Sequence, residues 1–359
     1  MDVETKLRML VRNTEEVVTE EELRTLLESG GGKGYLGFEP SGVFHIGWLI
    51  WAYKFKDLVD AGFDMILLAA TWHAWINDKL GGDLELIRAA SQHVVDVLNS
   101  IGLEGRFRVV YADELVDSQK YWGTLLRTAK ATSIARVRRA LTIMGRKADE
   151  AESDFSKLIY PLMQVTDIYE LDVDVALGGI DQRKAHMLAR DVAEKLGRKK
   201  VVAIHTPLLP SLHGVSRMEF QNLPKDELAA EIKMSKSKPE SAIFVTDSDE
   251  EIRNKIARAY CPPREVENNP VLGIAKYIIF RGMEVEFVVD RPSKYGGPLT
   301  YWRYEDLEKD YTEGRVHPLD LKNAVSDYLT KKVVGPIRDY IIRSGRIEVV
   351  KKILLSVTR

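Results

Sequence analysis

The order of apolar segments predicts an α/β fold: a doubly wound, mainly parallel sheet followed by a mainly helical C-terminal part. Strand-length apolar runs alternate with helical patterns up to about residue 205, and this alternation is typical of βαβ units. The run from Asp64 to Ala70 is continuously apolar, as expected for a parallel strand covered on both faces. After Pro210 the alternation ends, so the sheet is expected to end there too.

Each element is expected from its local pattern of apolar and turn residues. Strands are predicted at Gly34 to Phe38, Asp64 to Ala70, Arg106 to Tyr111, Val173 to Leu177 and Lys200 to His205. Helices are predicted at Val18 to Ser29, His45 to Ala61, Asp83 to Ile101, Tyr121 to Ala148, Phe155 to Leu171 and Arg183 to Leu196.

Two segments depart from the alternation. The long basic stretch from about Tyr121 to Ala148 has no strand beside it, which predicts an insertion on top of the sheet. A polar, loop-like segment runs from Ser211 to Glu240, and mainly helical segments follow with a hairpin expected around Glu284 to Val289. The domain boundary is therefore placed near residues 220 to 240.

Composition excludes several classes of protein. The chain has 359 residues, 45% hydrophobic and 30% charged, so a large buried core is available and disorder is excluded. One cysteine rules out an intrachain disulfide and a cysteine-rich zinc site. No apolar run approaches the length of a membrane span, and Met1 to Asn13 is too charged for a signal peptide. We expect a cytoplasmic protein with no membrane partner.

Positive charge is concentrated in two places, although the net charge is only −2. Ser118 to Ala148 carries eight lysines and arginines and no acidic residue, and the tail from Lys331 to Arg359 carries eight against two acidic residues. Two basic surfaces on a near-neutral protein suit a long anionic ligand that is contacted twice. An isolated basic run is more often a solvated helix face, so that alternative stays open.

The first chemical motif is His45-Ile46-Gly47-Trp48, which follows a strand and a Pro40-Ser41-Gly42 turn at a helix start. Free N–H groups and the helix dipole favour an anion there, and Gly47 would let a flat ring approach the backbone. His45 could donate to a phosphate. Taken alone, a histidine beside a glycine at a helix start is more often structural.

The second motif is Lys233-Met234-Ser235-Lys236-Ser237, in the segment after the sheet. Two lysines and two serines within five residues suit a triphosphate whose charge must be neutralised as pyrophosphate leaves. An exposed polar loop is the alternative for this motif alone. Its pairing with a His-x-Gly element after the first strand makes that alternative much weaker.

Together the two motifs resemble the HIGH and KMSKS elements of class I aminoacyl-tRNA synthetases. The chain resembles the tyrosyl-tRNA synthetase family of archaeal and eukaryotic type over nearly its whole length. The further supporting stretches are Gly34-Tyr35-Leu36-Gly37-Phe38-Glu39-Pro40-Ser41-Gly42, Ile159-Tyr160-Pro161-Leu162-Met163-Gln164, Gly178-Gly179-Ile180-Asp181-Gln182-Arg183-Lys184 and His317-Pro318-Leu319-Asp320-Leu321-Lys322. The final histidine of HIGH is Trp48 here, so position 48 is left out of the catalytic set.

The resemblance implies a Rossmann-like fold of the HUP class, a C-terminal anticodon-binding domain and a catalytic set of His45, Lys233 and Lys236. The ATP-binding residues that it implies are Gly37, Gly47, Gly179, Asp181, Lys233, Met234, Ser235, Lys236 and Ser237. The implied domains are residues 1–230 for catalysis, with an inserted segment near 115–155, a mobile loop at 231–240, and an anticodon-binding domain at 241–359.

An amino-acid pocket is predicted from spacing. Tyr160, Gln164 and Asp167 are four and three residues apart and share one helix face. Tyr35, on the first strand, and Asp167 can together hydrogen-bond a phenolic hydroxyl, and a substrate without that hydroxyl would leave them unpaired. By similarity to the family, Tyr160, Gln164 and Gln182 would bind the α-ammonium group. The alternative is a half-buried helix whose polar residues face solvent.

The Gly178-Gly179-Ile180-Asp181-Gln182 segment lies where a strand ends and a helix begins, the place where doubly wound sheets bind nucleotides. The resemblance implies that Asp181 binds the ribose hydroxyls, whereas a plain glycine turn is the alternative. His73 follows the second strand and could line the same crevice, although core packing is equally expected.

The reaction that these motifs predict is attack of the tyrosine carboxylate on the α-phosphate of ATP. A carboxylate is already ionised, so catalysis needs positioning and charge stabilisation rather than a general base. Mg²⁺ is expected to enter with ATP, and no protein metal site or zinc is expected. The tyrosyl group would then pass to the terminal ribose of the tRNA for tyrosine.

Binding of tRNA is assigned to both basic regions. Arg136, Arg138 and Arg139 in the insertion and Arg183 near the pocket could contact the acceptor end. In the C-terminal part, Tyr295 offers a stacking face, Asp320 could accept from a guanine edge and His317 could assist. The resemblance also implies a homodimer through the insertion. For Tyr295 the alternative is a loop aromatic that covers the core.

Three rival functions remain at this point. A tryptophanyl-tRNA synthetase shares the fold, but an indole lacks the phenolic hydroxyl that Tyr35 and Asp167 suit. A small-molecule nucleotidyltransferase would not require the helical C-terminal part. A catalytically silent RNA-binding relative is disfavoured by the intact His45, Lys233 and Lys236 and favoured only by Trp48.

Overall fold

The computed structural model describes residues 1–145, 154–214, 232–236, 238–282 and 284–356. Within them a six-stranded sheet has the order β1-β6-β5-β2-β3-β4. Five of its strands are parallel: β2 (Lys33–Phe38), β3 (Asp64–Ala69), β4 (Arg108–Tyr111), β5 (Val175–Gly179) and β6 (Val202–Thr206). The chain winds outward from β2 in both directions, which confirms the doubly wound sheet and puts a switch point between β2 and β5.

The sixth strand corrects the sequence prediction. β1 (Glu16–Val18) pairs antiparallel with β6 at the sheet edge, so Val18 belongs to a strand and not to the predicted helix. The helix α2 (Glu20–Glu28) begins after it, because Thr19 and Glu22 form reciprocal side-chain to backbone hydrogen bonds. A further helix, α1 (Val3–Val11), precedes the strand and was not predicted.

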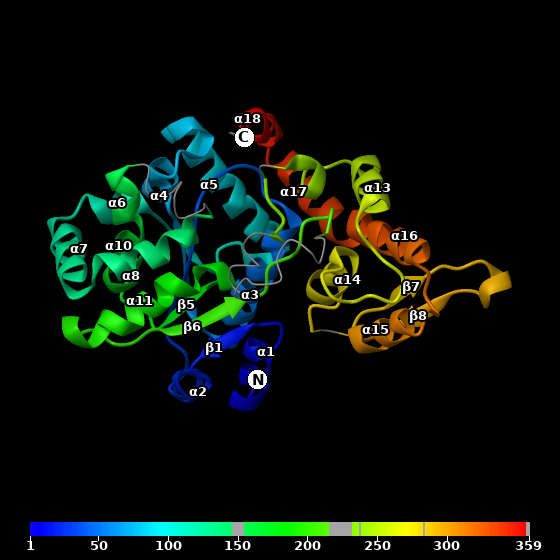
Figure 1. Ribbon diagram of the computed structural model, residues 1–359, viewed down its shortest axis with the longest axis horizontal. Coiled ribbons are helices and arrows are strands. Elements are labelled where there is room, and N and C mark those ends of the chain that lie inside the picture. The colour runs from blue at the N-terminus through cyan, green and yellow to red at the C-terminus, as the bar shows by residue number, and fades with distance from the viewer. Residues whose placement is uncertain (146–153, 215–231, 237, 283, 357–359) are drawn as a thin grey trace.

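Helices cover both faces of the sheet, as the continuous apolar strands require (Figure 1). On one face Leu36 belongs to a core that includes residues of α3 (Leu49–Ala61) and α5 (Leu84–Leu98). On the other face Tyr35 belongs to a core with residues of α10 (Phe155–Glu170) and α11 (Arg183–Ala193). Successive side chains of a strand point to opposite faces, so Tyr35 is directed toward α10.

The inserted segment is helical but is not one helix. After the short α6 (Ala112–Val116) it contains α7 (Gln119–Ala131) and α8 (Ile134–Ala140), and the described part ends at residue 145. Ser133 breaks the stretch, since its side chain accepts a hydrogen bond from the backbone N–H of Arg136 and starts α8. Residues 146–148, the end of the predicted long helix, lie outside the described residues. α7 and the short α4 (Thr71–Ile76) both pack against α10.

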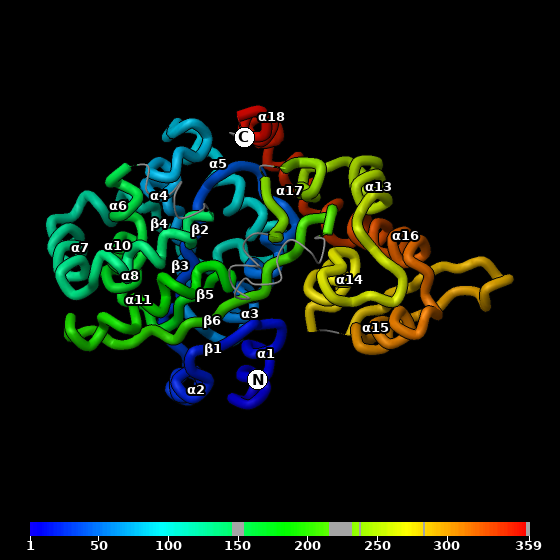
Figure 2. Tube along the Cα trace, in the orientation of Figure 1, coloured from blue at the N-terminus to red at the C-terminus, as the bar shows by residue number. Residues whose placement is uncertain are grey.

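The C-terminal part is mainly helical, as predicted. Its helices are α13 (Asp249–Arg258), α14 (Pro270–Ile274), α15 (Tyr304–Thr312), α16 (Pro318–Tyr328), α17 (Gly335–Arg343) and α18 (Ile347–Leu355). The expected hairpin exists but is wider than predicted: β7 (Phe287–Val289) pairs with β8 (Leu299–Tyr301), ten residues further along the chain. The tube in Figure 2 shows α18 returning to lie over α5 of the N-terminal part.

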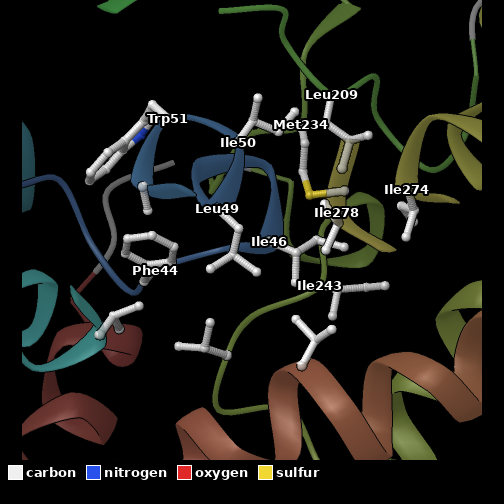
Figure 3. Packing of buried hydrophobic residues seen from close by; sticks show 14 of the residues in the cluster. Phe44, Ile46, Leu49, Ile50, Trp51, Leu209, Met234, Ile243, Ile274 and Ile278 are labelled. Atoms are coloured by element: carbon white, nitrogen blue, oxygen red, sulfur yellow. The ribbon is translucent and has the colours of Figure 1, made fainter. Parts of the chain in front are cut away.

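One apolar core joins the two parts of the chain. Met234, in the Lys233–Lys236 segment, is 3% exposed and lies beside Leu209 and Ile278 (Figure 3). The same cluster contains Ile46 at the start of the helical region before α3 and Ile274 of α14. The Lys233–Lys236 segment is therefore anchored by its methionine while its lysines remain on the polar side.

In the described ranges no helix is long and apolar enough to cross a membrane.

Candidate active site

A cavity of about 690 Å³ opens at the carboxyl ends of β2 and β5. Its wall is built from the end of β2, the turn that follows it, α10, the turn after β5 and the Lys233–Lys236 segment. The predicted residues that line it are Tyr35, Gly37, His45, Gly47, Tyr160, Gln164, Asp167, Gly179, Asp181, Gln182, Lys233, Met234, Ser235 and Lys236. Ser237 lies outside the described residues.

At one end of the cavity a buried carboxylate is held between two aromatic rings. Asp167 is 1% exposed, and its Oδ1 accepts a 2.8 Å hydrogen bond from the hydroxyl of Tyr121 on α7. The Nε2 of His73 lies 3.3 Å from Oδ2, a close approach without hydrogen-bond geometry. Burial raises the pKa of Asp167 to about 7 and lowers the pKa of His73 to about 4. His73 is therefore neutral, and the pair is not an ion pair.

Tyr35 lies in the same part of the cavity. Its side chain is 1% exposed and shares a hydrogen bond with Gln164. Burial and the nearby charge of Asp167 raise the pKa of Tyr35 far above its usual range, so its hydroxyl keeps its proton. The Nε2 of Gln164 donates to the Oε1 of Gln182 at 3.3 Å, and Gln182 donates to the carbonyl of Ile143 at 3.2 Å. Hydroxyl and amide groups from three elements thus converge on one buried region.

Glu39 is a site residue that sequence reasoning did not assign. It follows β2 and lines the cavity, where its Oε1 accepts hydrogen bonds from the Tyr160 hydroxyl at 3.2 Å and the Asn77 amide at 2.8 Å. Its other oxygen lies 3.6 Å from the Nζ of Lys79. Glu39 belongs to the Gly34–Gly42 motif, but its contact with Tyr160, 121 residues away, leaves no signal in local spacing.

The other end of the cavity is cationic. His45 is 4% exposed, and its Nδ1 has no hydrogen-bond partner among the described residues. Burial, with Lys236 and Lys233 nearby, lowers the pKa of His45 and keeps the ring neutral. A Cβ on Gly47 would lie 3.0 Å from that Nδ1, so the glycine makes room for the imidazole of His45 itself. The predicted open surface at Gly47 is therefore partly taken by a protein ring.

The two lysines of the Lys233–Lys236 segment have different partners. The Nζ of Lys233 lies 2.6 Å from the Oδ2 of Asp181, in the turn after β5. Gly179 is required beside this contact, because a Cβ there would lie 2.5 Å from Asp181 and 2.8 Å from the side chain of Leu208. The Nζ of Lys236 instead lies 3.2 Å from the hydroxyl of Ser41. Both lysines line the cavity.

The residues predicted to contact tRNA lie outside the cavity lining. Arg136 forms an ion pair with Asp191, and the Nε of Arg183 donates to Glu16 at 2.6 Å. In the C-terminal part Tyr295 is 62% exposed, at the tip of the loop between β7 and β8. His317 starts α16, with its Nδ1 accepting from the N–H of Leu319 at 3.2 Å, and Asp320 lies in the first turn of that helix.

The described residues contain no group of three or more histidine, cysteine or carboxylate side chains that could hold a metal ion. A divalent cation that accompanies a nucleotide would therefore be bound mainly by the phosphates of its own ligand.

The fold and this cavity define a class of protein, and comparison with known families agrees. The chain matches the family of tRNA synthetases class I (W and Y) over residues 32–219 and 224–333. It belongs to this family, and it is an enzyme of the class I aminoacyl-tRNA synthetases.

Several relatives that cover nearly the whole chain are named as tyrosine–tRNA ligases. The tyrosine–tRNA ligase of Aeropyrum pernix is 62% identical over 344 residues, covering 95% of this chain and 94% of the relative. That of Saccharolobus solfataricus is 55% identical over 364 residues, covering 100% and 99%. The crystal structure of tyrosyl-tRNA synthetase from Pyrococcus horikoshii with L-tyrosine has a TM-score of 0.88 at 42% identity, covering 98% and 100%.

A tryptophanyl-tRNA synthetase from Encephalitozoon cuniculi shares the fold, with a TM-score of 0.66 and 18% identity. Likeness at that identity concerns the fold alone. The comparisons thus agree with the family resemblance read from the motifs, and they do not favour the tryptophan alternative.

Proposed function

We propose that this chain activates L-tyrosine with ATP and transfers the tyrosyl group to the 3′ end of the tRNA for tyrosine. The observation that carries the proposal is a single cavity with two unlike ends. One end has the buried hydroxyl of Tyr35 and carboxylate of Asp167, and the other has His45, Lys233 and Lys236. The tyrosine–tRNA ligases that match 95% and 100% of the chain at 62% and 55% identity support the same substrate.

The phenol of tyrosine is read by a donor and an acceptor. Tyr35 keeps its proton and donates, whereas Asp167 accepts from the substrate hydroxyl with one oxygen while Tyr121 occupies the other. Phenylalanine would leave the Tyr35 hydroxyl proton and the second oxygen of Asp167 without the partner that the phenol supplies, which costs about 1–3 kcal/mol for each. Tryptophan would present an indole edge with a single donor, so it also fails to satisfy Tyr35.

The amino acid's ammonium group is bound nearer the middle of the cavity. Tyr160, Gln164 and Gln182 line the cavity and carry side-chain oxygen atoms that can accept from an ammonium group, as the family resemblance implies. Glu39 adds a negative charge behind Tyr160, with which it shares a hydrogen bond. When the ammonium group of the substrate is held here, its carboxylate points toward the cationic end of the cavity.

Activation needs no general base, because the attacking tyrosine carboxylate is ionised. His45 lies neutral at the start of a helical turn and donates to a phosphate oxygen, while Lys233 and Lys236 stabilise charge on the leaving pyrophosphate. Asp181 binds the ribose hydroxyls, and Gly37, Gly47, Gly179, Met234, Ser235 and Ser237 complete the nucleotide site. Mg²⁺ that enters with ATP would supply further charge neutralisation.

The second step requires tRNA to reach the cavity and a distant surface. Arg136 and Arg183 are assigned to the acceptor end, and Tyr295, His317 and Asp320 to the anticodon, with residues 241–359 as the anticodon-binding domain. Tyr295 projects at 62% exposure on a hairpin loop, as a base-stacking platform should. Residues 1–230 are assigned to the catalytic domain, and 231–240 to the loop that carries the two lysines.

The assembly is a cytoplasmic homodimer that pairs through the segment near 115–155. Apolar side chains in and beside this segment are exposed in the single chain, as a partner surface requires. They are Trp122, Leu126, Ile134 and Phe155.

The test is exchange of labelled pyrophosphate into ATP with each amino acid in turn. Tyrosine should support exchange, and tryptophan and phenylalanine should not. The matched control is the double variant Lys233→Ala, Lys236→Ala, which should bind tyrosine but lose exchange. Exchange driven by tryptophan alone would contradict the specificity, and no exchange with any amino acid would favour a silent RNA-binding relative.

A further inference from the structure

The tryptophan at position 48 lies directly against the ammonium group of Lys236. The Nζ is 3.5 Å from the centroid of the indole ring, well within the range of a cation–π contact. Lys236 is only 7% exposed, and its hydrogen-bond partners among the described residues are neutral: the Ser41 hydroxyl at 3.2 Å and the Gly42 carbonyl at 3.5 Å. The indole face therefore supplies electrostatic stabilisation to a buried cation that no adjacent carboxylate in the described chain pairs with.

The ring that receives this cation is fixed in place. The indole of Trp48 packs edge-to-face on Phe44 at 5.4 Å and on Phe38 at 6.3 Å, and it lies tilted against Trp51 at 5.7 Å. These neighbours come from the end of β2, from the turn and from α3. Because the three contacts restrict rotation of the ring, Trp48 offers a rigid platform instead of a mobile cover.

The two lysines differ in how far their partners neutralise their positive charge. Lys233 is paired with Asp181 at 2.6 Å, so part of its charge is already neutralised. Lys236 has instead a ring face, a hydroxyl and a carbonyl. Burial lowers the pKa of Lys236, while the charge of Glu39 and the indole face favour its protonated form. A cation–π contact orients an ammonium group without a full counter-charge, which leaves the charge available to a phosphate.

The residue type at position 48 fits this role. In the HIGH element this position holds a histidine, whose ring would repel Lys236 when protonated. An indole has no titratable nitrogen and has the strongest cation-binding face of the aromatic side chains. With tryptophan at position 48, the contact between the His45–Trp48 motif and the Lys233–Lys236 segment is therefore a cation–π contact.

We infer that Trp48 is a positioning residue that holds the Lys236 ammonium group over the nucleotide-phosphate end of the cavity. This inference rests on the proposed function, since it assigns a role in the activation step. Trp48 acts through Lys236 and does not itself contact the reacting atoms. Trp48 holds the Lys236 ammonium group in position before ATP binds. Its replacement should therefore affect the rate of activation more than the binding of tyrosine.

The kinetic test compares Trp48→Leu with Trp48→Phe, because both remove the indole but only phenylalanine keeps an aromatic face. In pyrophosphate exchange Trp48→Leu should lower kcat by about 10-fold to 30-fold, the range expected for a desolvated cation–π contact. The KM for tyrosine should change less than about 2-fold, and Trp48→Phe should recover much of the rate. Equal losses in the two variants would mean that packing alone matters, and would overturn the inference.

A double-mutant cycle separates this role from a structural one. In a Lys236→Ala background, Trp48→Leu should cause little further loss of kcat, because the group that it positions is gone. The same loss in both backgrounds would refute the coupling. Tyrosine affinity by calorimetry and the thermal midpoint report whether each variant is folded.

A readout independent of activity keeps the inference separable from the proposed function. Reductive methylation of lysines with ¹³C-formaldehyde preserves their charge and gives an NMR signal for each ammonium group. The Lys236 signal, assigned by its loss in Lys236→Ala, should be shifted upfield by the indole ring current and should lose that shift in Trp48→Leu. An unshifted signal in the parent protein would overturn the inference whether or not the enzyme exchanges pyrophosphate.

Discussion

Replacement of Asp167 by asparagine should stabilise the free protein above neutral pH while it impairs recognition of tyrosine. The carboxylate is 1% exposed, and burial raises its pKa from 3.8 to about 7. Between about pH 4 and pH 7 the folded state therefore holds a proton on Asp167 that the unfolded state releases. Asparagine has the same shape as the protonated acid, and its oxygen can still accept the hydrogen bond from Tyr121.

The size of the effect follows from proton linkage. A rise in pKa from 3.8 to about 7 is worth at most about 4 kcal/mol, since one pKa unit corresponds to 1.36 kcal/mol. For an acid with a raised folded-state pKa, stability is lost as pH rises from about 4 to about 7 and stays low above that. Between pH 5 and pH 8 the parent protein should thus lose about 2 to 3 kcal/mol that the variant keeps.

Denaturant unfolding of both proteins at several pH values, without ligand, measures this difference. All other titrating groups are common to the two chains, so the difference between the two pH profiles isolates position 167. The gap should be small near pH 4 and should widen up to about pH 7 in favour of asparagine. Parallel profiles for the two proteins, or a variant that is less stable at pH 8, would refute a desolvated carboxylate at this site.

Three other changes test separate parts of the cavity. Tyr35→Phe should raise the KM for tyrosine about 10-fold or more by removing one hydrogen bond to the phenol, without a comparable change in the KM for ATP; equal changes in both constants would contradict the assignment. Lys233→Ala should lower kcat for exchange by about 10²-fold to 10³-fold. The thermal midpoint should not change, because the contact of Lys233 with Asp181 lies at the cavity surface. A large fall in that midpoint would point to a structural role. Gly47→Ala should displace the imidazole of His45, whose Nδ1 would lie 3.0 Å from the new Cβ; steady-state exchange should show a lower kcat, and parental kinetics would show that the ring does not need its present position.

Local patterns were sufficient to predict the parallel strands but not the edge strand. Strands such as β3 are covered on both faces, so their apolar runs are continuous and visible in the sequence. β1 is three residues long, and its pairing depends on contacts such as that of Glu16 with His205, 189 residues away. Nothing within a short window distinguishes Val18 in such a strand from the first residue of the following helix.

The long insertion differs from β1, because its sequence does contain a local signal for the break in the predicted helix. Thr132 and Ser133 stand inside the predicted helix, and serine favours the position just before a helix starts. Ser133 caps α8 in this way. The apolar and basic periodicity on both sides was strong enough to hide the break.

Most of the cavity was predictable because its residues lie at strand ends or on one helix face. Tyr35 and Asp167 are examples: the strand alternation and the helix spacing each point them toward the same space. Tyr121 and Glu39 were missed because their roles depend on partners 46 and 121 residues away. Trp48 was noticed only as a departure from a motif, since its contact with Lys236 requires the fold.

The central claim is that one cavity holds the amino acid and the nucleotide phosphates together. A crystal structure with a non-hydrolysable tyrosyl-adenylate analogue tests it directly. The phenolic oxygen should lie within hydrogen-bond distance of Tyr35 and Asp167, with the phosphate near His45 and Lys236. An analogue bound with its phenol outside that pair, or with its phosphate remote from those cations, would contradict the account.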